Sequence, residues 1–471
     1  MIPALTFAGQ RTIVVGLGKS GLSAAAALGA GGADVSVWDD APEARRRAAQ
    51  RNLKILDLEK DQLDRVACVV WSPGVPHVLP KPHPLAQRAR ARGIPVVCDI
   101  DVLARAEPSA SYVGITGTNG KSTTTALTAH VLAASGRRVA VGGNLGTPAL
   151  DLAPLGPFGT YVLELSSYQL ELTPTLSCDV AILLNITPDH LDRHGGMDGY
   201  IAAKMNIFER ARFPAVAVVG VDDVHGQAIA ERLRAAGRHR VVAISAERAV
   251  PGGIYIENGS LIDAIDARPR GIADVSAWPC LPGRHNWQNA AAATAVARVL
   301  GVPGPAIATA LASFAGLAHR QELVATIRGV RFVNDSKATN ADATEKALAC
   351  YDNVYWIAGG RAKDGGIESL APYFPRLRHA YLIGEAADQF ADTLEGKVPF
   401  DLYDDFETAI EEAGRAALKS KASGAVVLLS PACASFDMFK NFEERGDRFR
   451  REVHALWPEG PPVTGAAGAA S

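Results

Sequence analysis

Short apolar runs alternate with helical segments along most of the chain, and most of the runs end in a polar or glycine-rich turn. Residues 12–15, 34–38 and 67–71 form three such runs near the N-terminus, and an alanine-rich helical segment separates the first two. Strands that alternate with helices predict parallel sheets built from strand–helix–strand units. The predicted fold class is therefore α/β, with doubly wound, mostly parallel sheets.

Two stretches without apolar periodicity divide the chain. Residues 107–109 and 316–322 have the composition of linkers or hinges. At 471 residues the chain is long enough for about three domains. We expect a Rossmann-like domain over residues 1–107, a P-loop ATPase-like domain over 108–316 and a second Rossmann-like domain over 317–457. Residues 458–471, mainly proline, glycine and alanine, are predicted to form a disordered tail.

A short loop between a strand and a helix carries the clearest chemical signal. It reads Gly-Thr-Asn-Gly-Lys-Ser at residues 117–122, with an apolar strand before it and a helical pattern from Thr124 onward. The N–H groups of such a loop bind phosphate, Lys121 reaches the outer phosphates, and the Ser122 hydroxyl can bind Mg²⁺. The longer Walker spacing would need a glycine where Ile115 stands, so this is a shorter form. The loop predicts an ATP site.

A second glycine-rich loop, residues 16–21, follows the strand 12–15. The next predicted strand, residues 34–38, ends directly before Asp39. In dinucleotide-binding folds such a loop holds a pyrophosphate and the carboxylate contacts a ribose or base. For this loop alone, a dinucleotide, another nucleotide and simple helix packing stay equally open. Ser72 adds a hydroxyl at the same predicted sheet edge. Two phosphate-binding loops favour an enzyme whose substrate carries its own nucleotide over a dehydrogenase.

Three side chains of the central region are candidates for a metal site. Glu164 interrupts an apolar run, and a buried carboxylate is unfavourable unless it is paired or binds a metal, so we favour a Mg²⁺ role. His190 fits a metal ligand and an ordinary loop histidine equally well. Lys204 lies in a predicted helix over residues 197–210 and, taken alone, is interpreted as a solvated helical lysine. Residues 282–289 are rich in side-chain amides that could bind adenine or simply cap a helix.

The last region repeats the pattern of strands that end in polar turns. Lys337, Lys363 and Ser435 follow predicted strands at residues 330–333, 354–358 and 426–429. Because parallel strands end at one edge of a sheet, these side chains could converge on an anion.

Composition narrows the function classes. A formal net charge of −2 argues against a nucleic-acid-binding protein, and 48% apolar with 21% charged residues is ordinary for a soluble globular protein. The six cysteines form no C-x-x-C pair, which fits reduced thiols in the cytoplasm better than disulfides or a zinc site. The N-terminus lacks the features of a signal peptide, and no run approaches the ~20 apolar residues of a membrane span. We expect a cytoplasmic protein without a membrane partner.

Residues 5–455 resemble the Mur ligases. The loop 117–122, the strand end at Glu164 and the turn 185–190 are similar to the wider family, which includes the folylpolyglutamate synthases. Residues 334–340 and 430–446 (SPACASFDMFKNFEERG) resemble the branch that adds D-glutamate. A folylpolyglutamate-type ligase would share the central domain but not the nucleotide-sugar fold of the first domain, and an NAD-binding protein is a minor alternative.

The resemblance implies a bacterial enzyme of peptidoglycan precursor synthesis that acts as a monomer. In this family ATP phosphorylates the carboxylate of UDP-N-acetylmuramoyl-L-alanine, and the amine of D-glutamate then attacks the acyl phosphate. The implied catalytic residues are Lys121, Glu164, His190 and Lys204. The implied Mg²⁺ ligands are Ser122, Glu164, His190 and a carbamate formed on Lys204.

The resemblance also implies three binding sites. ATP would be bound by Gly117, Thr118, Asn119, Gly120, Lys121, Ser122, Thr123, Asn289, Arg320 and Asp335. The UDP-linked substrate would be bound by Gly18, Lys19, Ser20, Asp39, Ser72, Asn144, Ser166, Gln169 and His190. D-Glutamate would be bound by Lys337, Thr339, Lys363, Ser435 and Phe442. Because water hydrolyses an acyl phosphate, we expect the domains to close around it.

Overall fold

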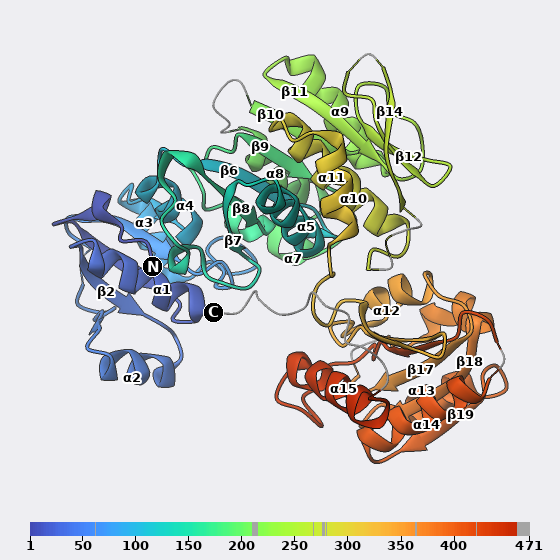
Figure 1. Ribbon diagram of the computed structural model, residues 1–471. Coiled ribbons are helices and arrows are strands. Elements are labelled where there is room, and N and C mark those ends of the chain that lie inside the picture. The colour runs from blue at the N-terminus through green and yellow to red at the C-terminus, as the bar shows by residue number, and fades with distance from the viewer. Residues whose placement is uncertain are drawn as a thin grey trace. The chain divides into compact units, whose positions relative to one another are not determined.

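The chain forms two compact units (Figure 1). The computed structural model describes residues 1–61, 63–209, 215–266, 268–275, 278, 280–362, 365–420 and 422–458. The first unit consists of Met1–Val275 with Arg284–Leu311, and the second of Ser276–Gly283 with Ala312–Ser471. The predicted tail lies outside the described residues except for Pro458. No helix in the described ranges is long and apolar enough to cross a bilayer.

The N-terminal part of the first unit is a parallel sheet in the order β3-β2-β1-β4-β5. Its central strands are short buried apolar runs, as expected for a covered parallel sheet. The strands are β1 (Arg11–Val15), β2 (Asp34–Trp38), β3 (Lys54–Ile55), β4 (Val66–Trp71) and β5 (Val96–Val97); the helices are α1 (Lys19–Ala30), α2 (Pro42–Gln50), α3 (Pro84–Ala91) and α4 (Asp99–Ala106). Because β1 and β4 are neighbours, the glycine loop after β1 and Ser72 after β4 lie at one sheet edge.

The central part of the first unit is a larger sheet in the order β14-β13-β12-β11-β10-β9-β6-β8-β7. Its strands are parallel except for the edge pairs β12–β13 and β13–β14. The strands are β6 (Ser111–Thr116), β7 (Arg138–Gly143), β8 (Gly159–Glu164), β9 (Val180–Leu183), β10 (Ala215–Gly220), β11 (His239–Ser245), β12 (Ile254–Glu257), β13 (Ser260–Asp263) and β14 (Arg270–Asp274). The helices are α5 (Lys121–Ala134), α6 (Ser167–Leu170), α7 (Leu191–His194), α8 (Met197–Glu209), α9 (Val224–Ala236), α10 (Arg284–Val299) and α11 (Gly304–Ala312).

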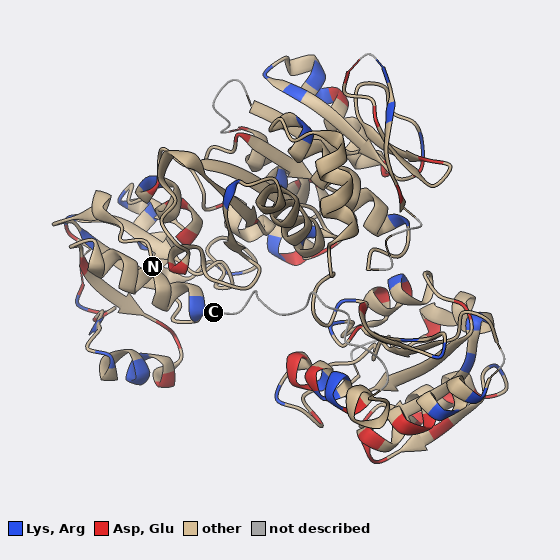
Figure 2. Cartoon of the chain, viewed as in Figure 1, with Lys and Arg blue, Asp and Glu red and all other residues tan. Residues whose placement is uncertain are grey.

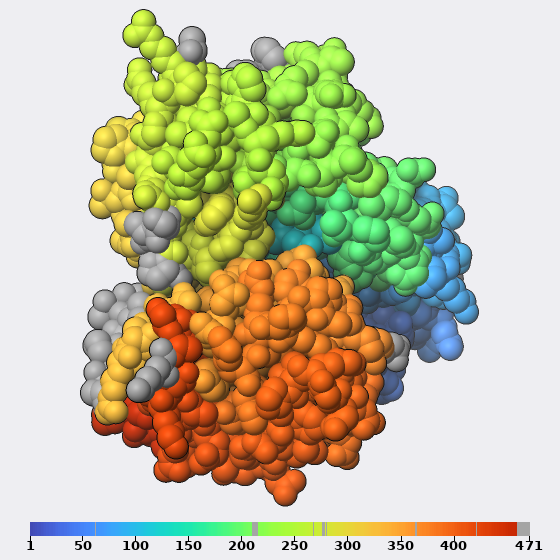
Figure 3. Space-filling view, turned by 90° about the vertical axis from the view of Figure 1, so that its right-hand side faces the viewer, coloured from blue at the N-terminus to red at the C-terminus, as the bar shows by residue number. Residues whose placement is uncertain are grey.

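The second unit contains a sheet in the order β15-β16-β20-β17-β18-β19, in which only the β15–β16 pair is antiparallel. The strands are β15 (Glu322–Ile327), β16 (Val330–Asn334), β17 (Val354–Gly359), β18 (Leu377–Ile383), β19 (Phe400–Tyr403) and β20 (Val426–Leu429). The helices are α12 (Ala341–Leu348), α13 (Ala387–Leu394), α14 (Phe406–Lys419) and α15 (Phe442–Leu456). Figure 3 shows one face of the surface of this unit, coloured from orange to red.

One apolar core runs through both parts of the first unit. The backbone N–H of Ile2 donates to Leu150 O at 2.7 Å, and the backbone N–H of Cys98 donates to Leu172 O at 2.9 Å. The Ser23 hydroxyl donates to the Asp151 carboxylate at 2.7 Å. The expected boundary at residue 107 lies within the first compact unit, and the expected boundary at residue 316 lies near the start of the main segment of the second unit.

The predicted α/β class with mostly parallel sheets is confirmed. The structure adds antiparallel strands at sheet edges, which the sequence pattern did not distinguish from parallel ones. It also starts α5 at Lys121, three residues before the predicted helical pattern, because the helix begins directly at the glycine that ends the loop.

Candidate active site

The phosphate loop connects β6 to α5 and requires both of its glycines. Gly117 and Gly120 have φ angles of +150° and +83°, which side chains rarely adopt. A Cβ atom on Gly120 would lie 2.4 Å from Asn289 Oδ1. The loop is held open from the side by Asn185, which accepts from the Asn119 N–H at 2.8 Å through its side chain. The backbone of the loop is therefore fixed before any ligand arrives.

Lys121 folds back over this loop. Its Nζ donates to the carbonyls of Gly117 at 3.0 Å and Thr118 at 2.8 Å. Ser122 follows in the first turn of α5 and is buried. The ammonium, the hydroxyl and the helix N-terminus are thus gathered at one end of α5, where an anionic phosphate is favoured.

Glu164 is the last residue of β8 and pairs with Ile115 of β6, directly before the phosphate loop. It is 3% exposed. Its Oε1 accepts from Asn144 Nδ2 at 2.8 Å, whereas its Oε2 is buried without a hydrogen-bond partner in the described part of the chain. A buried carboxylate oxygen of this kind is suited to a cation that arrives with the substrate.

Lys204 is buried, so its interpretation as a solvated lysine is wrong. It is 1% exposed, and its Nζ donates to Gly117 O at 2.8 Å and lies 4.6 Å from the centre of the Tyr200 ring. Burial, and then the charge of Lys121, lower the pKa of Lys204 to about 7. The sequence pattern missed this because α8 packs the lysine face inward against the loop.

His190 lies at the N-terminal end of α7 with a left-handed φ of +51°. Its side chain is about half exposed, with Nε2 3.6 Å from Asp189 Oδ2 and the ring 5.1 Å from the Tyr168 ring. Among the contacts of the described residues, none joins it to Glu164 or Lys204. The other three catalytic candidates are closely grouped, since Lys121 and Lys204 share Gly117 O and Glu164 borders the strand before that loop.

The N-terminal glycine loop is also held rigidly. Gly16 has a φ of +85°, and a Cβ atom there would lie 2.4 Å from Ser72 Cβ. The Leu17 N–H donates to Asp39 Oδ2 at 2.7 Å, so this carboxylate shapes the loop itself. Gly18 is the N-cap residue of α1, and Lys19 and Ser20 form its first turn.

Three more candidates for the UDP-linked substrate lie at the carboxyl ends of β7 and β8. Ser166 and Gln169 form a capping box around α6, with Gln169 N–H donating to Ser166 Oγ at 3.2 Å and Ser166 N–H donating to Gln169 Oε1 at 3.0 Å. The Asn144 backbone N–H donates to Glu164 O at 2.9 Å. Asn144 therefore contacts Glu164 through both its backbone and its side chain.

In the second unit, two candidates for the amino-acid site are in contact. The Lys337 Nζ lies 4.0 Å from the centre of the Phe442 ring. Thr339 follows in the same turn, with its N–H donating to Lys337 O at 2.9 Å, and Ser435 is buried after β20. Lys363 lies outside the described residues.

Arg445 was missed by sequence reasoning. It is 1% exposed, donates through Nε to Ser336 Oγ at 3.0 Å and through Nη2 to Ser336 O at 2.8 Å and Cys433 O at 3.1 Å. Burial lowers the pKa of Arg445 to about 10. The available signal was its place in the stretch 430–446, which resembles the D-glutamate-adding branch, although the charged start of α15 gives no sign that this arginine is buried. It joins the turns that carry Lys337 and Ser435.

Asp335 and Arg320 lie near the first strands of the second unit. Asp335 accepts from Ser430 Oγ at 2.8 Å and from the Gln321 N–H at 3.1 Å. Burial raises the pKa of Asp335 to about 7. Arg320 lies in the turn before β15, where its N–H donates to Leu317 O at 3.2 Å.

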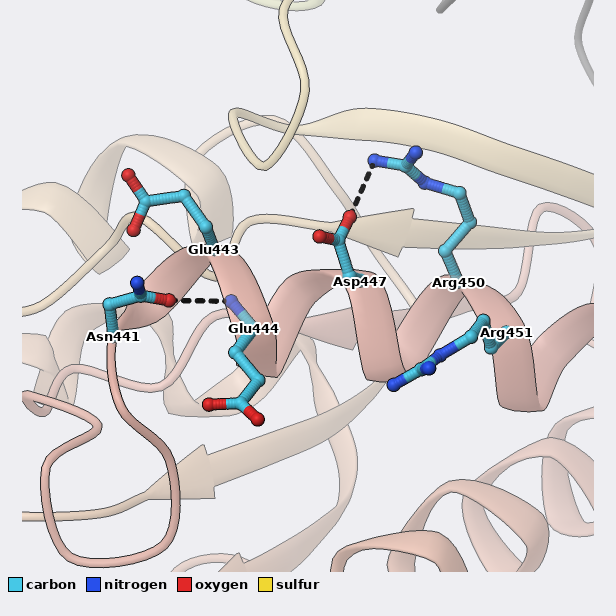
Figure 4. A pocket seen from close by; sticks show the side chains of 6 residues that line it. All are labelled: Asn441, Glu443, Glu444, Asp447, Arg450 and Arg451. Carbon is cyan, nitrogen blue, oxygen red and sulfur yellow. Dashed lines mark hydrogen bonds and ion pairs between the residues drawn. The ribbon is translucent and has the colours of Figure 1, made fainter.

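A broad hollow lies along α15 and is lined by residues at or within that helix (Figure 4). Asn441 caps the helix by accepting from the Glu444 N–H at 2.8 Å, and Asp447 pairs with Arg450 at 3.5 Å. Acidic and basic residues are mixed along α15 (Figure 2). Because its charges pair and carboxylates occupy its first turn, the hollow does not suit a dicarboxylate, and Lys337 is the better candidate.

Comparisons with known proteins cover nearly the whole chain. Family models described as Mur ligase MurD-like N-terminal domain, Mur ligase middle domain, and Mur ligase glutamate ligase domain match residues 10–98, 115–297 and 319–433. A UDP-N-acetylmuramoylalanine–D-glutamate ligase of Rhodospirillum rubrum is 56% identical over 97% of this chain and 97% of its own. The corresponding ligase of Paramagnetospirillum magneticum is 54% identical over 97% and 99%. The chain belongs to the Mur ligase family.

Solved Mur ligase structures share the fold. MurC of Thermotoga maritima, a UDP-N-acetylmuramate–alanine ligase, is 18% identical, with coverage of 95% of this chain and 99% of that chain and a TM-score of 0.56. MurF ligase of the same organism, in complex with ADP, is 20% identical, with coverage of 98% and 97% and a TM-score of 0.56. The family predicted from the sequence motifs is confirmed.

The residues of this Mur ligase fit Mg²⁺ as a cation that is bound together with phosphates. No group of three His, Cys, Asp or Glu side chains in the described ranges forms a metal cage. The free Oε2 of Glu164 and the buried hydroxyl of Ser122 are oxygen donors next to the phosphate loop. Mg²⁺ in phosphoryl-transfer sites is held by one or two protein oxygens, substrate phosphates and water, which is the donor set available here.

Proposed function

We propose that this chain is an ATP-dependent ligase that joins D-glutamate to UDP-N-acetylmuramoyl-L-alanine through an acyl phosphate, in the synthesis of peptidoglycan precursors. The observation that carries the proposal is the similarity along nearly the full length to relatives named for this reaction. A folylpolyglutamate-type ligase is disfavoured by the N-terminal domain match. An NAD-binding protein would leave the phosphate loop, Glu164 and Lys204 without a common purpose.

The first step brings two polyanions together, so cations must offset their repulsion. Lys121 supplies one at the outer phosphates, while loop N–H groups of residues 117–123 and the start of α5 bind the rest of the ATP phosphate chain. Ser122, Glu164 and His190 would hold Mg²⁺, which when bound neutralises phosphate charge. Glu164 supports this assignment through its free oxygen, whereas His190 would have to turn from its contact with Tyr168.

Lys204 is proposed to carry a carbamate. Its amine is buried next to the loop, and a pKa of about 7 leaves a large neutral fraction to react with carbon dioxide. A carbamate would replace a buried cation by a carboxylate, and that carboxylate could serve as a further metal ligand. The present contact with Gly117 O describes the unmodified lysine.

The substrates are assigned to the three groups of residues described above. Gly18, Lys19, Ser20, Asp39 and Ser72 would hold UDP, with Asn144, Ser166, Gln169 and His190 on the muramoyl-alanine side. Asn289, Arg320 and Asp335 would complete the ATP site. Lys337, Thr339, Lys363, Ser435 and Phe442 would bind D-glutamate, whose two carboxylates suit cations and backbone amides.

We further propose domain boundaries at residues 107, 316 and 457, hinges at 107–108 and 316–320, and a monomeric protein in the bacterial cytoplasm that binds neither nucleic acid nor membrane. Closure about the hinges would exclude water from the acyl phosphate.

Phosphate release with UDP-N-acetylmuramoyl-L-alanine, ATP and a panel of amino acids tests the proposal. Release should require all three substrates and should be strong with D-glutamate and weak with L-glutamate, because inversion moves the amine when both carboxylates are held. Equal use of the two enantiomers, or release without the UDP-linked substrate, would contradict the assignment.

A further inference from the structure

Asp99 carries a buried carboxyl group that none of the assigned roles uses. It is the first residue of α4 and is 3% exposed. Neither of its carboxylate oxygens has a hydrogen-bond partner among the residues that the structure describes. Burying an unpaired carboxylate destabilises the folded protein by several kcal/mol at least. We therefore expect this group either to bind a ligand or to be protonated.

The carboxyl group faces a small cavity beneath the N-terminal glycine loop. The cavity has a volume of about 10 Å³, which is room for about one water molecule. Two hydroxyl-bearing residues line it, Ser20 from the first turn of α1 and Ser72 from the end of β4. Both are assigned above to the UDP-linked substrate, so Asp99 lies behind the surface that would hold the diphosphate.

No charged side chain other than Asp99 lines the cavity. The groups that face it from β1, α1 and β4 are the side chains of Val14, Ala24, Val70 and Trp71 together with the two serines. The neighbouring titratable group is the Cys98 thiol, whose pKa burial raises well above 9. Burial raises the pKa of Asp99 more than the N–H groups of Asp99 and Ile100 and the Cys98 thiol lower it, so burial and whatever binds above the loop set its protonation state.

We propose that Asp99 is a positioning residue of the nucleotide-sugar site: in its protonated form it donates to one internal water, which then donates to both the Ser20 and the Ser72 hydroxyl. This inference rests on the proposed function.

The number of hydrogens that the water can donate explains why Asp99 must be protonated. A water that accepts a proton from Asp99 has two hydrogens left, one for each serine oxygen, so both serine O–H groups can point outward to the diphosphate. If Asp99 is ionised, the water must turn one hydrogen to the carboxylate. One serine then loses its inward donor, and its own proton is drawn away from the phosphate. An ionised Asp99 also repels the diphosphate directly.

Binding of the substrate should therefore be accompanied by proton uptake. Burial raises the pKa of Asp99 to about 6, partly opposed by the N–H groups at the start of α4. At pH 7 the free site would be mostly ionised, and binding should take up about 0.9 proton. Above this pKa the dissociation constant should rise roughly tenfold per pH unit.

Calorimetric titration of the full chain with UDP-N-acetylmuramoyl-L-alanine tests this, with Mg²⁺ and a non-hydrolysable ATP analogue present throughout. Two buffers of unequal ionisation enthalpy, neither of them phosphate, give the proton uptake at pH 7. The wild type should take up about one proton and bind roughly tenfold more weakly at pH 8 than at pH 7.

Asp99→Asn and Asp99→Ala separate positioning from packing. The asparagine amide donates permanently, as the protonated acid does, and it avoids the ionised form that dominates the free wild type at pH 7. This variant should therefore bind about tenfold more tightly than the wild type at pH 7, without proton uptake or the pH dependence. Asp99→Ala should bind about tenfold more weakly. Ser36→Ala is a matched control, because Ser36 is buried in the same sheet with an unpartnered hydroxyl, and it should behave as the wild type.

Proton uptake or pH dependence that is equal in the wild type and Asp99→Asn would overturn the inference, as would weak binding by Asp99→Asn that matches Asp99→Ala. If the variants do not fold, the wild type decides alone, and an uptake below about 0.2 proton refutes the inference. Failure of the wild type to bind this substrate at any pH would instead refute the proposed function and the inference with it.

Discussion

Glu164→Gln removes a charge from the candidate metal site while keeping its shape. The glutamine carbonyl can still accept from Asn144, as Oε1 now does at 2.8 Å, and only the unpartnered Oε2 is replaced. The change therefore tests the free carboxylate oxygen beside the phosphate loop, which the packing of the described residues does not explain.

The magnitude follows from this single lost contact. A charge-assisted interaction contributes roughly 1.5–3 kcal/mol, or about 10- to 150-fold, and a dry site strengthens it. We expect kcat/KM to fall by about 100-fold or more. Stability should move the other way: a buried carboxylate with one partner is unfavourable in the free protein, so the free energy of unfolding should stay constant or rise by about 1–2 kcal/mol.

Phosphate release measured across a range of Mg²⁺ concentrations, with urea unfolding in parallel, checks both expectations. Thr160→Val is a suitable control, because Thr160 is buried in the same strand and has no assigned role. Higher Mg²⁺ should restore part of the lost activity. Wild-type turnover at ordinary Mg²⁺, or a loss of activity that is matched by a loss of stability, would remove Glu164 from the mechanism.

Three further substitutions test the other assignments. Lys204→Arg keeps the cation but cannot form a carbamate, so phosphate release should fall by about 100-fold, and normal activity would refute the carbamate. Lys337→Ala should raise the KM for D-glutamate by about 10- to 150-fold and leave the KM for the UDP-linked substrate unchanged; an effect confined to ATP would place the amino-acid site elsewhere. Arg445→Met leaves two buried carbonyls without their donor and should destabilise the second unit by about 2–4 kcal/mol in urea unfolding, whereas the exposed Arg451→Met should have no effect.

Local sequence patterns were sufficient to predict many strands of the fold. The strand before the first glycine loop, at residues 12–15, and the strands at residues 330–333, 354–358 and 426–429 were predicted to within one residue, and a strand was correctly expected before the loop 117–122. Such strands can be predicted from the sequence because their apolar runs are short and end in turns with glycine or polar side chains. The antiparallel pairing of the edge strands β13, β14 and β15 could not be predicted, because the relative direction of two paired strands is not encoded in the sequence of either strand alone.

The residues of the candidate site also fall into two groups, those that the local sequence predicts and those that depend on tertiary packing. The loop 117–122 predicts a phosphate site from the sequence alone. Its glycines, lysine and serine lie within a few residues of each other, so the local sequence contains the whole motif. Lys204 shows the opposite case. It comes to Gly117 from a helix 87 positions away, and a helical lysine is read as solvated until the surface against which its helix packs is known.

The sequence by itself determined the order of the elements, the positions of the two glycine-rich loops, the family and the residue types in each candidate site. Only the tertiary structure decided which of those residues are changed by their surroundings: the free oxygen of Glu164, the lowered pKa of Lys204 and the isolated carboxyl of Asp99. The physical reason is that desolvation and partner choice are set by atoms brought together from distant strands and helices. A pattern along the chain can place a charged group on an element, but the packing of that element decides whether the group is solvated, paired or left in need of a ligand.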